Sequence, residues 1–405
     1  MEQAGRPRAR PGWIVTIVVI LLVLLVAVNY LRPVPRVTPL LDAADLSQGS
    51  FASVPWPGNA QGALGAMGAG VLGGSPHQHA RPIASVTKVM TALVVLKAKP
   101  LTKGESGPTL TVSDADVTAY QKEKAVQQSV VAVESGEQLS ELQALQGMLI
   151  PSGNNMAELL ARWAFGSLNA AVRQMNREAR SLGMTRSTFA DASGASPRTM
   201  SVPTDLVVLG ERAMANEVLA QIVSQPDITL PVAGRVYNVN YILGKDGIFG
   251  IKTGTAVEAG ACYLFAAPRD VSGQQIVIVG AVTGLPTLDL AFEAARTLLA
   301  FAQQGLQMRQ VISRGEVVGR YQPPWGSSAS IVARDDLSVP AWPGERVAGA
   351  LEAPGLDAPA GSGVRVGTIS VEVGMAGHAT RYRVPIETQG TLAPAGNLWR
   401  LTRTG

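Results

Sequence analysis

The sequence predicts an α+β fold, in which an antiparallel sheet is flanked by helices and interrupted by an inserted helical lobe. Apolar stretches at 248–255, 261–268 and 275–283 are separated by Gly, Asp and Ser turns, which is typical of neighbouring antiparallel strands. Two more short strands are expected between residues 51 and 74, so the sheet would combine strands from both ends of this segment. Residues from about 100 to 225 carry mostly helical patterns, which predicts the inserted lobe.

Helices are expected where apolar residues recur at a helical spacing. These ranges are 84–97 ahead of the lobe, 139–149, 155–163, 169–182 and 205–214 within it, and 287–303 after the last strand of the sheet. Residues 100–140 are mixed and polar, and an excursion with short strands is expected there. From 308 to 392 Pro, Gly and alternating Val and Ile dominate, which predicts a small all-β domain.

Length and composition indicate a chain of two or three domains and exclude several kinds of site. The chain has 405 residues, and a domain averages roughly 150. The net charge of +4 is spread along the chain without a dense Lys/Arg run, so no nucleic-acid partner is expected. The single cysteine, Cys262, excludes an intrachain disulfide and a cysteine cluster for zinc. Only His77, His79 and His378 offer imidazoles, so we expect neither a metal nor a Ser-His-Asp triad.

The N-terminal region predicts a membrane anchor. Residues 13–31 are apolar on every face and long enough to cross a bilayer as a helix, which argues against a buried core helix. Arg6, Arg8 and Arg10 precede this run, so residues 1–12 would form a cytoplasmic tail and the rest would lie outside the cytoplasm. A cleaved signal peptide is the alternative, although no clear cleavage site follows the run.

The remaining chain divides into a linker, two domains and a tail. Residues 32–50 contain three prolines and a polar patch, which indicates a tether. The catalytic domain is expected over 51–305 and the all-β domain over 308–392. Residues 393–405 would form a C-terminal tail, which carries no amphipathic apolar stripe.

The helix over 84–97 carries Ser85 and Lys88 three residues apart, which places both side chains on one face. A hydroxyl with an amine one turn away is the minimum for a serine nucleophile activated by lysine. The alternative is a capped amphipathic helix that contains these residues by chance.

Two later motifs could converge on this helix. Ser152 and Asn154 stand in a loop between helices, where a hydroxyl and an amide can point into a cleft; the alternative is a plain helix cap. Lys252 and Thr253 lie on the strand at 248–255, where a cation and a hydroxyl can bind a carboxylate, or where the lysine merely protects a sheet edge. Gly254 would let a ligand backbone approach closely.

In the order SxxK, SxN and KTG, the three motifs resemble those of the D-alanyl-D-alanine carboxypeptidases, the low-molecular-mass penicillin-binding proteins of the penicillin-binding protein 5 type. The likeness covers roughly 50–390. It rests on Ala84-Ser85-Val86-Thr87-Lys88-Val89-Met90-Thr91, Gly147-Met148-Leu149-Ile150-Pro151-Ser152-Gly153-Asn154-Asn155, Met175-Asn176, Leu182-Gly183-Met184 and Gly250-Ile251-Lys252-Thr253-Gly254.

The resemblance implies a fold like that of serine β-lactamases and DD-peptidases, and a role for each motif residue. Ser85 would be the acylated nucleophile, Lys88 its base, and Ser152 a proton relay. Asn154 would hold the substrate amide, and Lys252 and Thr253 the terminal carboxylate. The backbone N–H groups of Ser85 and Thr255 would form the oxyanion hole.

Elementary chemistry supports a base role for Lys88 only in a special environment. Free lysine has a pKa of about 10.4, so it must be desolvated or held near another cation, here Lys252, before it can accept a proton. The chain departs from the family at Asn155, where Asp is common, and in the loop 192–197, which lacks a frequent His.

We therefore expect a membrane-tethered serine DD-carboxypeptidase that trims peptidoglycan stem peptides ending in D-Ala-D-Ala, without a metal or organic cofactor. β-Lactams would inhibit it covalently. The alternatives are a β-lactamase, for which no deacylating Glu is evident, and an inactive cell-wall-binding or scaffold protein.

Overall fold

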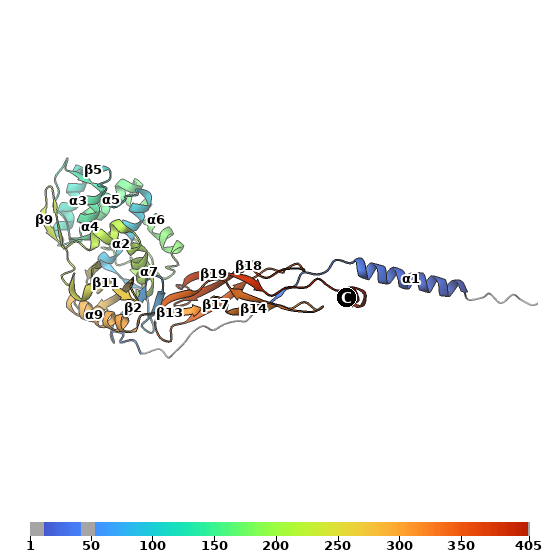
Figure 1. The fold of residues 1–405 in the computed structure, drawn as a ribbon. Helices are drawn as coiled ribbons and strands as arrows, with labels where there is room; N and C mark the ends of the chain where they lie inside the picture. Colours follow the sequence, from blue (N-terminus) through green and yellow to red (C-terminus); the bar gives the residue numbers. More distant parts are fainter. Residues whose placement is uncertain (1–11, 42–52, 404–405) are drawn as a thin grey trace, which may run out of the picture.

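The computed structural model describes residues 12–41 and 53–403, and it consists of a compact part, an elongated β part and one long apolar helix (Figure 1). The helix α1 (Gly12–Leu31) lies at the far end of the elongated part from the compact part, and residues 397–402 lie beside it. Among the described residues α1 alone is long and apolar enough to cross a membrane, with a mean hydropathy of 3.0.

The compact part is built on a five-stranded antiparallel sheet. Its order is β10 (Gly250–Ala256), β11 (Gly260–Val271), β12 (Gln274–Leu285), β2 (Gln61–Ala66) and β3 (Gly70–Gly74). β12 pairs with β2 from the other end of the segment, which confirms the predicted sheet. β10 is an edge strand, so one side of it is free to face the helix that carries Ser85.

Alternate residues of the sheet belong to two hydrophobic cores. Ala63 and Leu264 belong to the core shared with the helical lobe, whereas Leu64 and Phe265 belong to the core shared with α9 (Leu288–Gly305). This alternation follows from the pleat of a strand. The sheet therefore lies between two helical layers, and the predicted α+β fold is confirmed.

The lobe contains the predicted helices and two more. The predicted ones are α2 (Thr87–Ala98), which follows the short helix η1 (Ala84–Val86), and α4 (Glu141–Leu149), α5 (Asn154–Phe165), α6 (Leu168–Ser181) and α7 (Pro203–Met214). The additional ones are α3 (Asp114–Ala125) and α8 (Glu217–Val223). The short strands expected over 100–140 are present at 109–111 and 138–140, whereas α3 between them was not predicted. α3 has little apolar periodicity, but Ser113 and Asp116 form a reciprocal capping box that stabilises its N-terminus.

Short strands and turns complete the compact part. They are β4 (Arg81–Pro82) with β7 (Met200–Ser201), β5 (Thr109–Thr111) with β6 (Gln138–Ser140), β8 (Asp227–Leu230) with β9 (Gly234–Tyr237), and the short helix η2 (Lys245–Gly247).

The elongated part is all-β between residues 307 and 389. Its strands are β13 (Gln307–Ile312), β14 (Val317–Tyr321), β15 (Ala329–Ala333), β16 (Leu337–Ala341), β17 (Val347–Glu352), β18 (Arg365–Val373) and β19 (Thr380–Gln389). The six-stranded sheet has the order β1-β14-β15-β19-β18-β17, and β13 pairs with β16.

The segment after α1 is not a free tether over its whole length. β1 (Pro39–Leu41) pairs with β14, and the backbone of Val37 pairs with that of Leu356. The prediction of a linker over 32–50 is therefore wrong for residues 37–41, and 42–50 lie outside the described residues. Pro39 is tolerated because it stands at the first position of an edge strand.

Candidate active site

Ser85 stands in η1, immediately before the buried helix α2. Every residue of α2 from Thr87 to Leu96 is buried, and no side chain caps the helix, so the alternative of a capped amphipathic helix is wrong. Ala84 adopts a φ of 45°, in the left-handed region that non-glycine residues rarely occupy. Such strained residues cluster at functional sites, and this one turns the chain just before the half-buried Ser85.

Lys88 is fully buried and contacts three oxygen atoms. Its Nζ lies 2.7 Å from Ser85 Oγ, 2.6 Å from Asn154 Oδ1 and 2.9 Å from the carbonyl oxygen of Ser193. The amide and carbonyl oxygens can only accept hydrogen bonds, whereas the serine hydroxyl can also donate. A neutral amine has two N–H donors and one lone pair. Lys88 Nζ donates to Ser85 Oγ in the structure. In the neutral amine, Asn154 Oδ1 and the Ser193 carbonyl would take the two N–H groups and the lone pair would face the Ser85 hydroxyl.

The electrostatics of the site favour this neutral form. Burial is the main cause that holds the pKa of Lys88 well below its usual value, and the positive charge of Lys252 lowers it further. Asp191 and Glu123 act in the opposite direction. Burial also lowers the pKa of Lys252, to about 7. The structure thus brings the two lysines close enough to interact, as the sequence predicts.

The Ser152–Asn154 loop forms the second wall of the site. Ser152 is buried with a φ of 68°, another non-glycine residue in the left-handed region. Asn154 accepts from Lys88 and donates from Nδ2 to Gln128 Oε1 at 2.8 Å. The neighbouring Asn155 donates to the carbonyl of Val131 at 2.8 Å and accepts from its N–H at 3.0 Å. An aspartate could not donate the first of these bonds, which explains the amide at this position.

Lys252, Thr253 and Gly254 lie on the edge strand β10, beside η1. A Cβ atom at Gly254 would lie 2.8 Å from the carbonyl oxygen of Ile83 and 2.9 Å from the backbone nitrogen of Ser85. The backbone that approaches Gly254 in the structure is the chain's own. Thr255 follows as an exposed residue of the same strand, while Lys252 and Thr253 are buried.

The loop from Asp191 to Thr199 contains contributors that carry no recognised motif. Asp191 accepts from the N–H groups of Gly194 at 2.7 Å and Ala195 at 2.8 Å, and from the Ser193 hydroxyl at 2.9 Å. This turn presents the Ser193 carbonyl to Lys88. A signal existed in the sequence, because Asp followed by Ser and Gly is typical of such side-chain-stabilised turns.

Glu123, in the last turn of α3, is a second contributor that sequence reasoning missed. Burial, and after it the nearby Glu158, raise its pKa to about 7, although the positive charge of Lys88 opposes the shift. One carboxylate oxygen is buried without a hydrogen-bond partner. Nothing in the sequence around Glu123 points to the site, because α3 itself was not expected.

No group of His, Cys, Asp and Glu side chains that could hold a metal occurs in the described parts of the chain. The positively charged end of the site consists of Lys252, with the Thr253 hydroxyl beside it. The arrangement offers a nucleophile, a base and an amide in mutual contact, with a second lysine close enough to lower the pKa of the base. Such a set suits acyl transfer with a carboxylate-bearing substrate.

Comparisons with known proteins agree with this geometry. A family model described as D-alanyl-D-alanine carboxypeptidase matches residues 67–283, more than half of the chain. The D-alanyl-D-alanine carboxypeptidase DacB2 of Mycobacterium tuberculosis is 33% identical over 215 residues, which cover 51% of this chain and 69% of that protein. A D-alanyl-D-alanine endopeptidase of Pseudomonas aeruginosa is 29% identical over 207 residues, covering 49% of this chain and 64% of that protein.

A solved structure extends the likeness beyond the compact part. Penicillin-binding protein 5 from Haemophilus influenzae matches with a TM-score of 0.63 at 19% identity, covering 84% of this chain and 100% of that one. At this identity the match shows the fold alone. Together with the family model, it explains why the three motifs meet here. The chain therefore belongs to the D-alanyl-D-alanine carboxypeptidase family and is a serine-type DD-peptidase, the enzyme class that its motifs predict.

Proposed function

We propose that this enzyme releases the terminal D-alanine from peptidoglycan stem peptides ending in D-Ala-D-Ala, through an ester formed on Ser85. The observation that carries the proposal is the contact set of Lys88, whose Nζ lies 2.7 Å from Ser85 Oγ while two pure acceptors occupy its N–H groups. A lysine held in this way can take the serine proton at neutral pH.

In the first half-reaction Ser85 Oγ attacks the carbonyl carbon of the penultimate D-alanine, and its proton passes to Lys88. The tetrahedral intermediate then collapses, the C–N bond breaks, and the leaving amine takes the proton from Lys88 through the Ser152 hydroxyl. The backbone N–H groups of Ser85 and Thr255 would stabilise the oxyanion, each contributing about 3 kcal/mol. In the second half-reaction a water hydrolyses the ester with Lys88 again as base.

Lys252 and Thr253 would bind the carboxylate of the terminal D-alanine. The ammonium supplies charge and the hydroxyl supplies a hydrogen bond, and both are buried, so the contact would form in a medium of low dielectric constant. Asn154 would bind the substrate amide through the amide group that also contacts Lys88. β-Lactams present a carboxylate beside a strained amide, so they would acylate Ser85 in the same geometry.

We further propose that α1 anchors the enzyme in the cytoplasmic membrane with the N-terminus inside and the catalytic domain outside. Support comes from the length and uniform apolar surface of α1 and from Arg6, Arg8 and Arg10 before it.

Intact mass spectrometry after incubation with penicillin tests the proposal. We expect an adduct on the native chain, lost slowly, and none on Ser85→Ala. Rapid hydrolysis of the drug would indicate a β-lactamase instead, and absence of an adduct would indicate a scaffold. Incubation with a pentapeptide and with a cross-linked peptide dimer then separates carboxypeptidase from endopeptidase activity, because only the former releases free D-alanine.

A further inference from the structure

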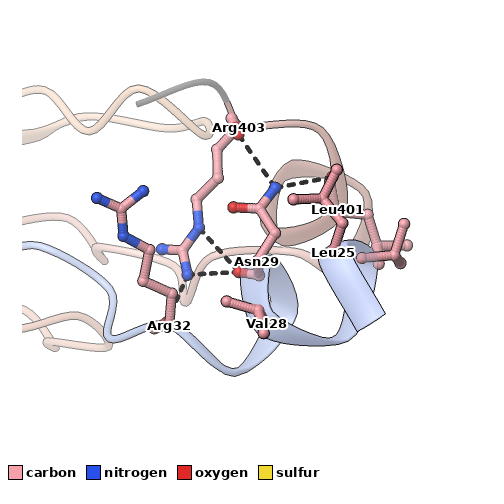
Figure 2. Close-up of a pocket in the computed structure, with 7 residues that line it drawn as sticks. Leu25, Val28, Asn29, Arg32, Leu401 and Arg403 are labelled. Carbon is pink, nitrogen blue, oxygen red and sulfur yellow. Dashed lines mark hydrogen bonds between the residues drawn. The ribbon is translucent and has the colours of Figure 1, made fainter. Parts of the chain in front are cut away.

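The C-terminal residues form a joint with the outer end of α1. The helix α10 (Asn397–Thr402) lies beside α1, although residues 393–405 were expected to form only a tail. Asn29 of α1 donates to the carbonyls of Leu401 at 3.0 Å and Arg403 at 3.1 Å (Figure 2). Arg403 in return donates to the carbonyls of Asn29 at 2.7 Å and Pro33 at 3.1 Å, and to that of Arg32. Each side chain thus satisfies carbonyls at the end of the other helix.

A cavity of about 400 Å³ lies in this joint. Leu25, Val26, Val28 and Leu401 make its walls apolar, while Arg32 and Arg403 stand at its other end (Figure 2). The Arg403 guanidinium already donates hydrogen bonds to backbone carbonyls. Arg32 is exposed, and its guanidinium makes no hydrogen bond or ion pair with any described residue. The cavity therefore has an apolar base and an available cation at its rim.

The position of this cavity along α1 matches the outer boundary of a bilayer. Twenty helical residues span about 30 Å, which equals the hydrocarbon thickness of a membrane. Arg32 would then lie in the headgroup layer, with Leu25 about 10 Å deeper among the acyl chains. Trp325 and Trp399 pack with ring centroids 4.7 Å apart near the same end, as aromatic side chains at a membrane interface do.

The charge at this level is one-sided. Residues 12–41 and 391–405 contain arginines but no Asp or Glu. Arg36 finds a counter-charge in Asp357 at 3.2 Å, whereas Arg32 has none among the described residues. Arginines on the outer side also oppose the proposed orientation of the anchor. An anion bound at Arg32 would neutralise its unpaired charge and would also weaken this opposition to the orientation.

We propose that the joint between α1 and α10 binds one anionic glycerophospholipid, with its phosphate at Arg32 and an acyl chain along Leu25, Val28 and Leu401. The proposal rests on the membrane anchoring proposed above. A bound lipid would fix the joint at the membrane surface, so that the β part holds the active site at a constant height.

Native mass spectrometry of the full-length chain, released from detergent micelles that contain defined lipids, tests this site. We expect the native chain to retain phosphatidylglycerol about tenfold more than phosphatidylcholine, and Arg32→Gln to remove this preference. Arg36→Gln is the matched control, because Arg36 lies outside the cavity, and it should keep the preference. Equal retention of the two lipids by the native chain, or an unchanged preference in Arg32→Gln, would overturn the proposal.

Two further experiments test whether an acyl chain occupies the apolar part of the cavity. Val28→Phe fills the cavity without a change of charge and should lower phosphatidylglycerol retention about tenfold, whereas Val23→Phe, on α1 but outside the cavity, should not. Glycerol phosphate should not displace the lipid, since displacement would mean that the phosphate alone is recognised. Labelling by a fluorescent penicillin should be equal in all variants. This readout separates a failed lipid site from a failed assignment of the enzyme, because labelling takes place at Ser85 and needs no residue of the joint.

Discussion

A methyl group at Gly254 should uncouple the edge strand β10 from the catalytic serine. The added Cβ would lie 2.8 Å from Ile83 O, 2.9 Å from Ser85 N and 3.1 Å from Val86 N. All three are backbone atoms, so no side chain can rotate away. Ordinary contact begins at 3.4 Å, and η1 must therefore move away from β10 by about 3.4 − 2.8 = 0.6 Å.

This displacement is large for an active site. A misplacement of 1 Å can reduce a rate about 100-fold, so 0.6 Å should slow acylation by about 10- to 100-fold. Overpacking of this kind costs about 1–3 kcal/mol of the free energy of unfolding. In a domain of this size the melting temperature would fall by about 2–4 °C for each kcal/mol, and the variant should remain folded.

The assay is the second-order rate constant for labelling Ser85 with a fluorescent penicillin, measured beside the melting temperature. Gly73→Ala serves as the matched control in the same sheet, because its Cβ would meet only Trp56 Cζ2 at 3.9 Å. We expect Gly73→Ala to label like the native chain. If Gly254→Ala labels within threefold of the native rate while folded, the edge strand does not position the serine and the reasoning is wrong.

Three more predictions concern the titrating groups. In the free enzyme, kcat/KM for a peptide substrate should fall as pH rises through about 7, because the Lys252 ammonium proposed to bind the carboxylate loses its proton. In Lys252→Arg this fall of kcat/KM should move above pH 9. The free energy of unfolding should rise from pH 7 toward 10.5, because over this range the unfolded chain holds a proton on Lys252 that the folded chain has released. In denaturant titrations, the free energy of unfolding of Lys252→Met should depend less on pH. Glu123→Gln removes a negative charge that raises the pKa of Lys88, so the acid limb of the acylation rate should shift to lower pH. An unshifted acid limb would show that Glu123 does not act on the base.

The sequence predicts the catalytic domain well because its signals are local. Each strand of the five-stranded sheet carries its own apolar run and turn residues, and each motif spans only three or four consecutive residues. By contrast, α3 is polar and depends on the Ser113–Asp116 cap, which apolar periodicity does not register. β1 has only three residues and is held by β14 from the other end of the chain, so no local pattern could indicate it.

Lys88 contacts Ser85 and Asn154, and the groups that orient these side chains come from other segments. Asp191 organises the turn that offers the Ser193 carbonyl, and Gln128 fixes the Asn154 amide. Both act through contacts between segments far apart in the sequence. At Gly254 the sequence indicates a close approach of backbone, and the structure shows that Ile83, Ser85 and Val86 make one.

These supporting contacts explain how a buried lysine can serve as a base. Burial alone would lower the pKa of Lys88 in any apolar site, but it would also leave the amine free to turn away from the serine. Asn154 Oδ1 and the Ser193 carbonyl occupy its two N–H groups at 2.6 and 2.9 Å, so the remaining lone pair can point only toward Ser85 Oγ. Lys252 opposes protonation of Lys88 by its charge. In the proposed mechanism, Lys88 would therefore pass the proton of Ser85 on to the leaving amine. The site therefore needs three segments far apart in the chain, because one must bury the amine, one must orient it, and one must supply the second cation.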